Sequence, residues 1–463
     1  MNRGLPLLLA GLSLAVISIA GLIQDVAWIA QPFYSWAWWS FILLLDGFCV
    51  LKRGRSLLTT RRRVALPLAN ASVTFWFAFE ALNLRFRNWY YVGCYELEEW
   101  TDFLVCGIFG VTAFATVFIG IFETIDALGA SGLWRDWRRE RRRLPSWTSW
   151  AVQGLGFTMA ALAILFPYWL APLIWGSLSF LLDPWNYRAG RRSFLGDIER
   201  GEFGRVARVF LGGLICGFVW ESLNFIAPQK WIYTVHGLEN LKLFEMPLLG
   251  FLGFPALALD CVSFASLFST WCLGNQTWED PDDALQELPD TPPHRRGFYL
   301  SLPLQAGFCI LVAYGINLTN VGSVAVKLDD LQALPEAARE QLIKEGIARP
   351  RRLARALTRA DRQSMLSNIG LDGEAADQVL QELELYEFKG IGAGWGRVLK
   401  AVGVTSIDEL RKSTAEDLHR ALTELTGSDD EPPLEWVRVW VLASRSRGVL
   451  LRSTDEPEHT TGP

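Results

Sequence analysis

The chain contains nine apolar blocks, each close to the length of a helix that crosses a lipid bilayer. They occupy residues 5–23, 36–51, 64–82, 103–122, 147–166, 169–182, 206–226, 247–273 and 298–318. A membrane-spanning helix needs about 20 mainly apolar residues. Only a helix or a closed barrel satisfies its own backbone hydrogen bonds inside lipid. The sequence therefore predicts an all-α, polytopic membrane protein with nine spans, of which 36–51 and 169–182 are short.

The first block, preceded by Arg3, also has features of a secretory signal, because the segment from Ser18 to Ala20 resembles a cleavage site. A similar block recurs inside the chain at 147–166, where it cannot be a signal. We therefore interpret 5–23 as a span. The 21 tryptophans support a membrane location, since many lie at block ends, where indole rings suit the membrane interface.

Other classes of protein fit the composition less well. The net charge of −5 gives no global positive field of the kind that marks nucleic-acid binders. The seven cysteines lie mostly in apolar runs without a CxxC pair, and only four histidines occur. We expect the cysteines to be packing residues, and we predict no metal site and no cofactor.

Lysine and arginine are concentrated in alternate loops. Residues 52–63 hold six basic residues and no acid, 123–147 contain WRDWRRERRR, and 184–205 contain five arginines. The positive-inside rule places these loops and the N-terminus in the cytoplasm. Nine spans then place the C-terminal region outside it, whereas the failure of one short block to cross would make that region cytoplasmic. Nucleic-acid binding by the arginine runs is an alternative that topology explains better.

The membrane region contains an internal repeat. FILLLDG followed by RGRSLL (36–58) matches WGSLSFLLDP followed by AGRRSFL (175–195), and FWFAFEALNLRFRNWYY (75–91) matches FVWESLNFIAPQKWIY (218–233). A unit of four helices returns the chain to the same side, so the copies share one orientation. We predict transmembrane repeat 1 at 1–135 and repeat 2 at 136–275. An acidic, proline-rich cytoplasmic linker (276–297) and a ninth span (298–318), which resembles the first helix of a truncated third copy, would follow.

Each repeat carries polar residues near the outer end of its third helix. The candidates are Glu80, Asn83 and Asp102 in the first repeat and Glu221, Asn224 and Glu245 in the second. In the E-x-x-N pairs, a spacing of three places the carboxylate and the amide on one helix face. Acids at membrane depth are costly and become candidates for acid–base or ion chemistry. A structural clamp that fixes the outer loop is the alternative, and we favour it.

Three further acids complete the inventory. Asp260 lies nearest the middle of a span and joins the candidates. Asp46 and Asp183 adjoin basic loops, and we expect them to form interfacial ion pairs.

The outer loops are similar to those of the small membrane carotenoid (lycopene) cyclases, which are built from short-helix repeats with paired glutamates near a proline. Glu98 and Glu99 in the first repeat, and Glu245 with Pro247 in the second, carry this likeness. The paired acids and the proline do not occur together in either repeat. The resemblance implies an enzyme that acts on a lipid or isoprenoid through carboxyl groups.

Residues 319–455 are expected to form a soluble helical domain, followed by a disordered tail at 456–463. The stretch 386–422 resembles a helix-hairpin-helix module, with Gly390, Ile391 and Gly392 in the hairpin and Gly396 where alanine is usual. Residues 331–366 resemble a degenerate first copy. Such modules bind DNA phosphates or dock proteins, and Lys389 and Arg397 flank this hairpin. Because residues 319–463 hold 24 acids against 19 bases, we favour a protein partner over nucleic acid or pure packing.

The sequence leaves three functions open. The leading hypothesis is a membrane scaffold or interaction protein, in contact with lipid, whose C-terminal domain docks a partner protein. The alternatives are a membrane-embedded enzyme for a lipid or isoprenoid substrate and a transporter that uses the same carboxylates.

Overall fold

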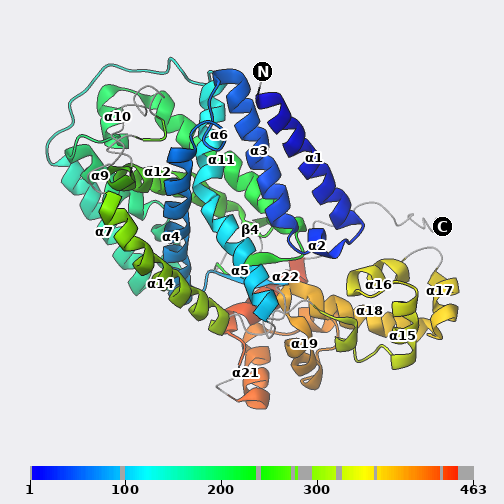
Figure 1. Ribbon diagram of the computed structural model, residues 1–463. Coiled ribbons are helices and arrows are strands. Elements are labelled where there is room, and N and C mark those ends of the chain that lie inside the picture. The colour runs from blue at the N-terminus through cyan, green and yellow to red at the C-terminus, as the bar shows by residue number, and fades with distance from the viewer. Residues whose placement is uncertain are drawn as a thin grey trace, which may run out of the picture. The chain divides into compact units, whose positions relative to one another are not determined.

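The computed structural model describes residues 3–93, 100–235, 241–272, 277–279, 295–319, 326–358, 362–427 and 431–446. These residues are mostly helical, which confirms the predicted all-α class (Figure 1). The chain divides into two compact units. Met1–Trp89, Leu97–His236 and Leu243–Asn320 form the first unit, and Tyr90–Glu96, Gly237–Lys242 and Val321–Pro463 form the second.

The first unit consists mainly of long apolar helices. These are α1 (Gly4–Ile23), α3 (Phe33–Arg53), α4 (Arg62–Phe86), α5 (Trp100–Ala115), α6 (Val117–Ala130), α7 (Thr148–Leu165), α9 (Ser177–Arg188), α11 (Phe203–Ile226), α12 (Gly253–Cys272) and α14 (Arg295–Thr319). Shorter pieces join them: α2 (Ala27–Ala30), α8 (Pro167–Leu170), η1 (Ala171–Ile174), α10 (Phe194–Arg200) and η2 (Leu248–Leu252). Among the described residues, eight segments are long and apolar enough to cross a membrane.

Two helical hairpins are closed by glycines. A Cβ atom on Gly4 of α1 would lie 2.7 Å from the carbonyl oxygen of Gly47 in α3. A Cβ atom on Gly156 of α7 would lie 2.8 Å from the backbone nitrogen of Leu181 in α9. Small residues therefore let the backbones of α1 and α3, and of α7 and α9, approach closely.

The predicted sixth span, 169–182, is not one continuous helix. Proline at 167 and 172 begins α8 and η1, because proline donates no backbone hydrogen bond and clashes with the preceding turn. The chain then returns along α7 as α9. Arg188, the last residue of α9, donates to the Gln153 side chain at 2.6 Å and lies 4.0 Å from the ring centre of Trp150, so α9 runs antiparallel to α7.

Aromatic rings join the two predicted repeats in a reciprocal way. Trp38 and Trp175 occupy matching positions, eight residues before Asp46 and Asp183. Trp38 contacts Trp220 of α11, with ring centres 5.5 Å apart, and Trp175 stacks on Phe79 of α4 at 4.9 Å. Phe79 and Trp220 themselves match, since each precedes the glutamate of its E-x-x-N pair. Each repeat therefore contacts the other through the same pair of positions.

The described strands are short. β1 (Trp89–Val92) pairs with β2 (Lys230–Tyr233), and β3 (Lys242–Leu243) pairs with β4 (Met246–Pro247). Thr234, directly after β2, donates its N–H to the carbonyl of Asn88, directly before β1, at 2.8 Å. The strands β1 and β2 are therefore antiparallel.

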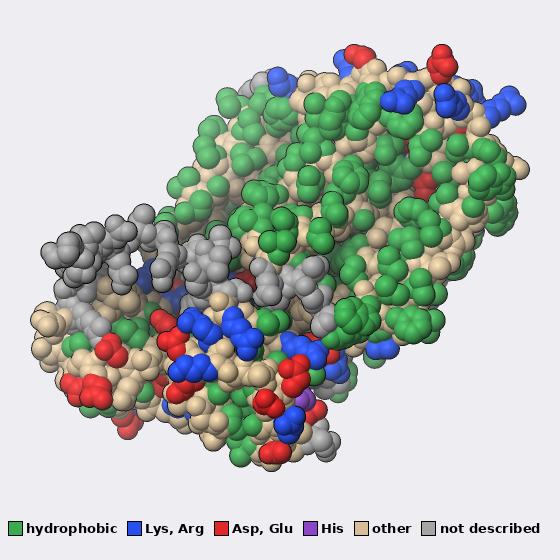
Figure 2. Space-filling model, turned by 180° about the vertical axis from the view of Figure 1, so that it is seen from behind, with side chains coloured by type: hydrophobic (Ala, Val, Ile, Leu, Met, Phe, Trp, Pro, Cys, Tyr) green, Lys and Arg blue, Asp and Glu red, His purple; other side chains and the backbone are tan. Residues whose placement is uncertain are grey.

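The first unit exposes much of its apolar surface. In the spanning segment of α14, 6% of the residues are buried, and in those of α1 and α7 the share is 17%. Figure 2 shows hydrophobic side chains over the visible face of this unit, with lysine and arginine gathered at one end. Surfaces of this kind are unusual on soluble monomers.

The second unit is a set of short helices around its own core. They are η3 (Leu328–Asp330), α15 (Glu336–Lys344), α16 (Pro350–Leu357), α17 (Arg362–Ile369), α18 (Gly373–Glu387), η4 (Phe388–Gly390), α19 (Gly392–Ala401), α20 (Ile407–Lys412), α21 (Ala415–Thr426) and α22 (Leu434–Ser446). Leu353, Val379, Tyr386, Leu399 and Trp440 are completely buried. The predicted tail, 456–463, lies outside the described residues, as does most of the predicted linker 276–297.

Candidate functional site

Asn83, at the end of α4, clamps the backbone that follows the helix. Its Nδ2 donates to the carbonyl of Trp89 at 2.9 Å, and its Oδ1 accepts from the N–H of Asn88 at 2.9 Å and of Trp89 at 3.3 Å. The αL conformation of Arg87 (φ 53°) turns the chain back toward the amide. One side chain therefore satisfies both backbone groups of Trp89.

Asn224, at the end of α11, makes the matching clamp. Its Nδ2 donates to the carbonyl of Trp231 at 3.0 Å, and its Oδ1 accepts from the N–H of Trp231 at 3.0 Å. Asn224 is completely buried. In both copies the predicted asparagine fixes the backbone of the predicted tryptophan.

The paired glutamates hold aromatic donors. Glu80 accepts from the indole N–H of Trp76 at 3.0 Å and of Trp89 at 3.3 Å. Glu221 accepts a hydrogen bond from the Tyr233 hydroxyl at 2.8 Å. The hydroxyl oxygen of Tyr233 in turn accepts from the indole N–H of Trp231 at 2.9 Å. Glu80 is 1% exposed and Glu221 is completely buried, so both carboxyls lie in the core.

Glu221 differs from Glu80 in one respect. Its Oε2 atom is buried and has no hydrogen-bond partner among the described residues. A buried carboxyl oxygen without a donor is costly. Glu221 is therefore the predicted acid with the clearest unused bonding capacity.

The second predicted acid of each repeat is Asp102 or Glu245, and the structure describes the side chain of Glu245 alone. Glu245, between β3 and β4, is 2% exposed and forms an ion pair with Lys230 at 3.1 Å. Lys230 of β2 thus holds Glu245 beside the strand whose Trp231 is bound by Asn224, and the sequence did not identify Lys230 as this partner. Asp102 belongs to α5, and its side chain lies outside what the structure describes; Glu98 and Glu99 also lie outside the described residues.

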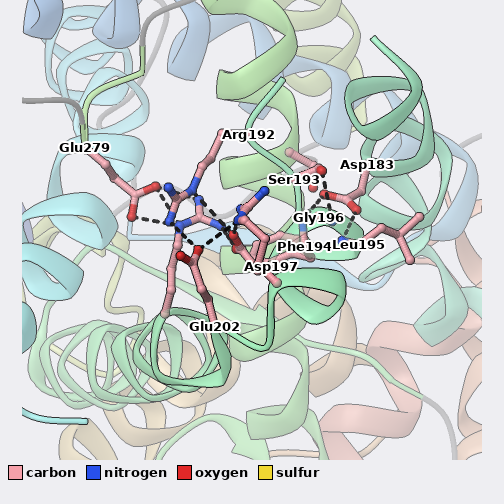
Figure 3. Close-up of polar contacts among 12 residues, drawn as sticks. Asp183, Arg192, Ser193, Phe194, Leu195, Gly196, Asp197, Glu202 and Glu279 are labelled. Carbon is pink, nitrogen blue, oxygen red and sulfur yellow. Dashed lines mark hydrogen bonds and ion pairs between the residues drawn. The ribbon is translucent and has the colours of Figure 1, made fainter. Parts of the chain in front are cut away.

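Within the residues that the structure describes, Asp46 and Asp183 form none of the expected ion pairs. Asp46 accepts from the N–H of Leu58 at 3.0 Å and from the Thr59 hydroxyl. Asp183 accepts from the N–H groups of Phe194 and Leu195 at 2.6 and 2.9 Å (Figure 3). The backbone that follows satisfies these carboxylates instead: the loop after α3 donates to Asp46, and the first turn of α10 donates to Asp183.

Asp260 of α12, although distant in sequence, caps the N-terminus of α9. Its two carboxylate oxygens accept from the N–H of Gly176 at 2.8 Å and of Ser179 at 2.6 Å. Gly176 adopts φ +88°, which glycine tolerates well. The break before α9 leaves first-turn N–H groups without intrahelical partners, and Asp260 satisfies two of them. Its role in the structure is that of a helix cap.

The sequence did not predict an ionic network around α10. The Asp197 carboxylate is completely buried and pairs with three arginines: Arg192, Arg200 and Arg205 (Figure 3). Arg205 also pairs with Glu279 at 2.6 Å. The available signal was the presence of acids within the basic loop 184–205, which a count of basic residues overlooks.

The network also stabilises the charged forms of its outer acids. Burial acts to raise the pKa of Glu279, but the Arg205 guanidinium outweighs it and holds that pKa below its usual value. Burial likewise acts to raise the pKa of Glu202, and bonds from Arg200 together with nearby Arg192 lower it. Positive and negative groups balance here, which fits a lock between loops better than a binding site.

The stretch predicted as a hairpin in the second unit contains left-handed backbone. Lys389, Gly390 and Gly392 all adopt positive φ, of 47°, 73° and 68°. Ile391 is completely buried, and its N–H donates to the carbonyl of Phe388 at 3.0 Å. The chain thus turns sharply between α18 and α19. Arg397 is exposed on α19.

The hairpin also has a partner within its own unit. Tyr90, which belongs to the second unit, donates its hydroxyl to the carbonyl of Lys389 at 2.7 Å. Its ring stacks on Trp436 of α22, with centres 4.5 Å apart. One hairpin carbonyl is therefore already used by the chain itself.

Metal chemistry finds no support in the described part of the chain, where no three His, Cys, Asp or Glu side chains gather closely enough to hold an ion. The described cysteines Cys49, Cys216 and Cys261 are buried with free thiols.

Comparison with known protein families gives a match in the C-terminal region. Residues 332–446 match the model of a domain of unknown function, DUF4332. No curated protein and no solved structure matches the chain significantly.

Proposed function

We propose that this chain is a multi-pass membrane scaffold whose C-terminal domain docks a partner protein. The observation that carries the proposal is how the predicted polar residues are used. Asn83 and Asn224 bind backbone groups, Glu80 binds indoles, and Glu245 pairs with Lys230. Side chains committed to holding loops support a structural membrane part rather than a catalytic one.

A membrane location is supported by the eight apolar helices and by their exposed surfaces. Leu300, Leu304, Ile310 and Leu311 of α14 are each more than two-thirds exposed. Lipid is the solvent in which such a helix is stable. Behaviour without detergent tests this: a monodisperse, detergent-free chain would contradict the proposal.

We place the N-terminus and the arginine-rich loops in the cytoplasm and the C-terminal domain on the opposite side. Because α9 runs back along α7, we count the broken segment 169–182 as a membrane crossing. The nine crossings that result support opposite sides for the N-terminus and the C-terminal domain. Duplication is supported by the two asparagine clamps and by the reciprocal aromatic contacts. Accessibility of a C-terminal tag in intact cells, compared with an N-terminal tag, tests the sidedness; a C-terminal tag protected like the N-terminal one would refute it.

A protein partner is favoured over nucleic acid at the hairpin. Lys400, the third basic residue nearby, is bound by Glu382 at 2.7 Å, and the Ile391 N–H is used internally. Affinity for DNA depends on free cations and backbone donors. The exposed cation near the hairpin, Arg397, suits an acidic protein surface.

The docking role is tested by complementation of cells that lack the chain. Deletion of 331–463 should abolish complementation, and Lys389→Glu with Arg397→Glu should weaken it. A matched control reverses two exposed charges elsewhere in the same unit, Lys412→Glu and Arg420→Glu. Full complementation by the deletion would eliminate the scaffold role.

Glu221 favours a second candidate function. Its buried Oε2 atom without a hydrogen-bond partner could accept a proton or an ion, as in an enzyme for a lipid or isoprenoid, or in a transporter. Glu221→Gln keeps an oxygen acceptor for Tyr233 but removes the titratable group. If the Gln variant folds and complements fully, the chemical roles of Glu221 are excluded.

A further inference from the structure

The loop between α6 and α7 carries a dense run of exposed cations. Residues 133–143, here called the basic segment, have the sequence LWRDWRRERRR, with six arginines and two acids. All six arginines are exposed. The segment has no regular helix or strand after residue 136, yet its path is defined: it runs past α10 (Figure 1).

Backbone hydrogen bonds hold the basic segment against α10 and α11. Arg139 donates its N–H to the carbonyl of Gly201 at 2.9 Å, and Arg142 donates its N–H to that of Glu199 at 3.0 Å. Gly204 donates its N–H to the carbonyl of Trp137 at 3.0 Å. Main-chain groups therefore hold the segment in place, while the arginine side chains stay exposed, with the Arg139 guanidinium 5.7 Å from the ring centre of Phe203.

Nothing in the described part of the chain neutralises these side chains by an ion pair. The neighbouring arginines on and beside α10 behave differently, because Arg200 and Arg205 are matched by Asp197, Glu202 and Glu279 (Figure 3). The lock beneath the segment is electrically balanced, and the segment adds a net charge of +4, although Arg138 also acts on Glu202 of the lock. A fixed, uncompensated cluster of guanidinium groups binds phosphate well.

Another arginine beside α10 also has unused donors. In the loop before α10, the Nε and Nη1 atoms of Arg191 are buried and make no hydrogen bond within the described residues. Guanidinium donors that remain unbonded in this way are costly.

Exposed tryptophans identify the source of the anion. Trp134 and Trp137 lie within the basic segment, 37% and 43% exposed, and their ring centres are 5.9 Å apart. Trp147 and Trp150 follow at the start of α7 and are about two-thirds exposed. Indole rings at the end of a spanning helix favour the headgroup layer. Free phosphate would not account for them, and their continuation onto the first turn of a spanning helix favours lipid over nucleic acid.

We propose that the basic segment is a binding surface for the headgroups of anionic phospholipids in the adjacent leaflet. The inference rests on the membrane location proposed above. The arginines bind lipid phosphates, the tryptophans insert at the level of the headgroups, and the backbone bonds to α10 and α11 keep the cations in place before lipid binds. Each cation near an anionic membrane surface strengthens binding about fivefold.

Lipid selectivity of the full-length chain in neutral detergent micelles tests the proposal. Two fluorescent lipids with the same acyl chains are titrated, phosphatidylglycerol and phosphatidylcholine, at low and high salt. We expect wild type to bind phosphatidylglycerol at least ten times more tightly, with a preference that shrinks as salt rises. The neutralised variant should lose the preference: Arg135→Gln, Arg141→Gln, Arg142→Gln and Arg143→Gln. The control removes four charges from the second unit: Arg349→Gln, Arg351→Gln, Arg352→Gln and Arg355→Gln.

Two glycine variants separate the effect of the segment's fixed position on lipid binding from the effect of its charge. A Cβ atom on Gly201 would lie 2.1 Å from the carbonyl oxygen of Arg139, so Gly201→Ala should displace the segment and weaken the preference with every arginine present. Gly190 has a similar φ, +69° against +74°, and open space around it. Gly190→Ala therefore introduces the same backbone strain without a steric clash, and it should leave lipid selectivity unchanged.

Several outcomes would overturn the inference. Equal affinity of wild type for the two lipids would do so, as would an unchanged preference in the neutralised variant or an equal loss in the control. Competition by inorganic phosphate as strong as that by the lipid would indicate an adventitious anion surface. Stronger competition by double-stranded DNA would assign the segment to nucleic acid. A chain that remains soluble without detergent would instead refute the membrane location itself.

Discussion

Asn83 and Asn224 make the same pair of hydrogen bonds, because each amide binds both the N–H and the carbonyl of the tryptophan that follows its helix. Each helix thereby ends in a fixed turn that carries a short strand. The same use of an amide at two places separated by a complete predicted repeat is difficult to attribute to chance. It also explains why the E-x-x-N spacing is kept although the intervening loops differ in length.

Removal of either amide should loosen the strand that follows. Asn83→Ala and Asn224→Ala each leave buried backbone groups without partners, which costs about 1–3 kcal/mol. We expect faster amide hydrogen exchange at Trp89 or Trp231 respectively, measured on the full chain in detergent. The effect should stay within the altered copy.

Asn70 offers a control on the same helix as Asn83. It donates to the side chain of Gln305 at 2.8 Å, and its side chain forms no hydrogen bond to the strands that the structure describes. Asn70→Ala should leave exchange at Trp89 unchanged. If it loosens Trp89 as much as Asn83→Ala does, the clamp has no specific role.

The sequence was sufficient to locate these residues and to favour a structural clamp, but not to identify every partner. Local spacing indicated that Glu80 and Asn83 share a helix face, and the repeat supplied the second copy. What spacing cannot provide is a partner distant in sequence, such as Asp260 for Gly176 or Glu279 for Arg205. Hydropathy likewise predicted a sixth span at 169–182, but the backbone break in that block is stabilised by a carboxylate from α12.

Asp260 should therefore determine the stability of α9. Asp260→Ala removes the acceptors of two buried N–H groups, and we expect a loss of several kcal/mol in the free energy of unfolding. Asp260→Asn keeps one oxygen and should recover part of the loss. Thermal unfolding in detergent, followed by circular dichroism, measures both. An alanine variant as stable as wild type would contradict the capping role.

Glycine at position 396 should be necessary for the packing of α19 against α18, although the resemblance to helix-hairpin-helix modules would place alanine there. A Cβ atom at this position would lie 2.1 Å from the Tyr386 ring, so α19 approaches α18 only without a side chain. We expect Gly396→Ala to destabilise the second unit by about 1–3 kcal/mol.

The same helix supplies a control for Gly396. Gly394 has nothing within 4 Å of an added Cβ atom. Gly394→Ala should stabilise the unit by about 0.5 kcal/mol, since alanine loses less backbone entropy in a helix. Calorimetry of the two variants should give shifts of opposite sign, and shifts of the same sign would exclude close packing as the cause.

The stability of α18 and α19 should depend on pH through Glu382. Burial acts to raise the pKa of this 3%-exposed carboxyl, but hydrogen bonds from Lys400, the Ala333 N–H and Tyr386 outweigh it and lower the pKa below its usual value. A lowered pKa in the folded state means that folding favours the ionised form. The contribution is therefore complete above the unfolded pKa, about 4.3, and is lost as pH falls through the folded value.

Glu382→Gln provides the test. At pH 7 the variant should lose about 1–2 kcal/mol, because a neutral amide binds Lys400 more weakly than a carboxylate does. Between pH 5 and pH 3 its stability should fall less steeply than that of wild type. Hydrogen exchange of the α18 and α19 amides in the full chain measures both effects. The control is Glu374→Gln, at an exposed position of the same helix, whose stability should fall between pH 5 and pH 3 as steeply as that of wild type. If its stability falls as gently as that of Glu382→Gln, the pH dependence arises from the general charge of the unit and not from the buried pair.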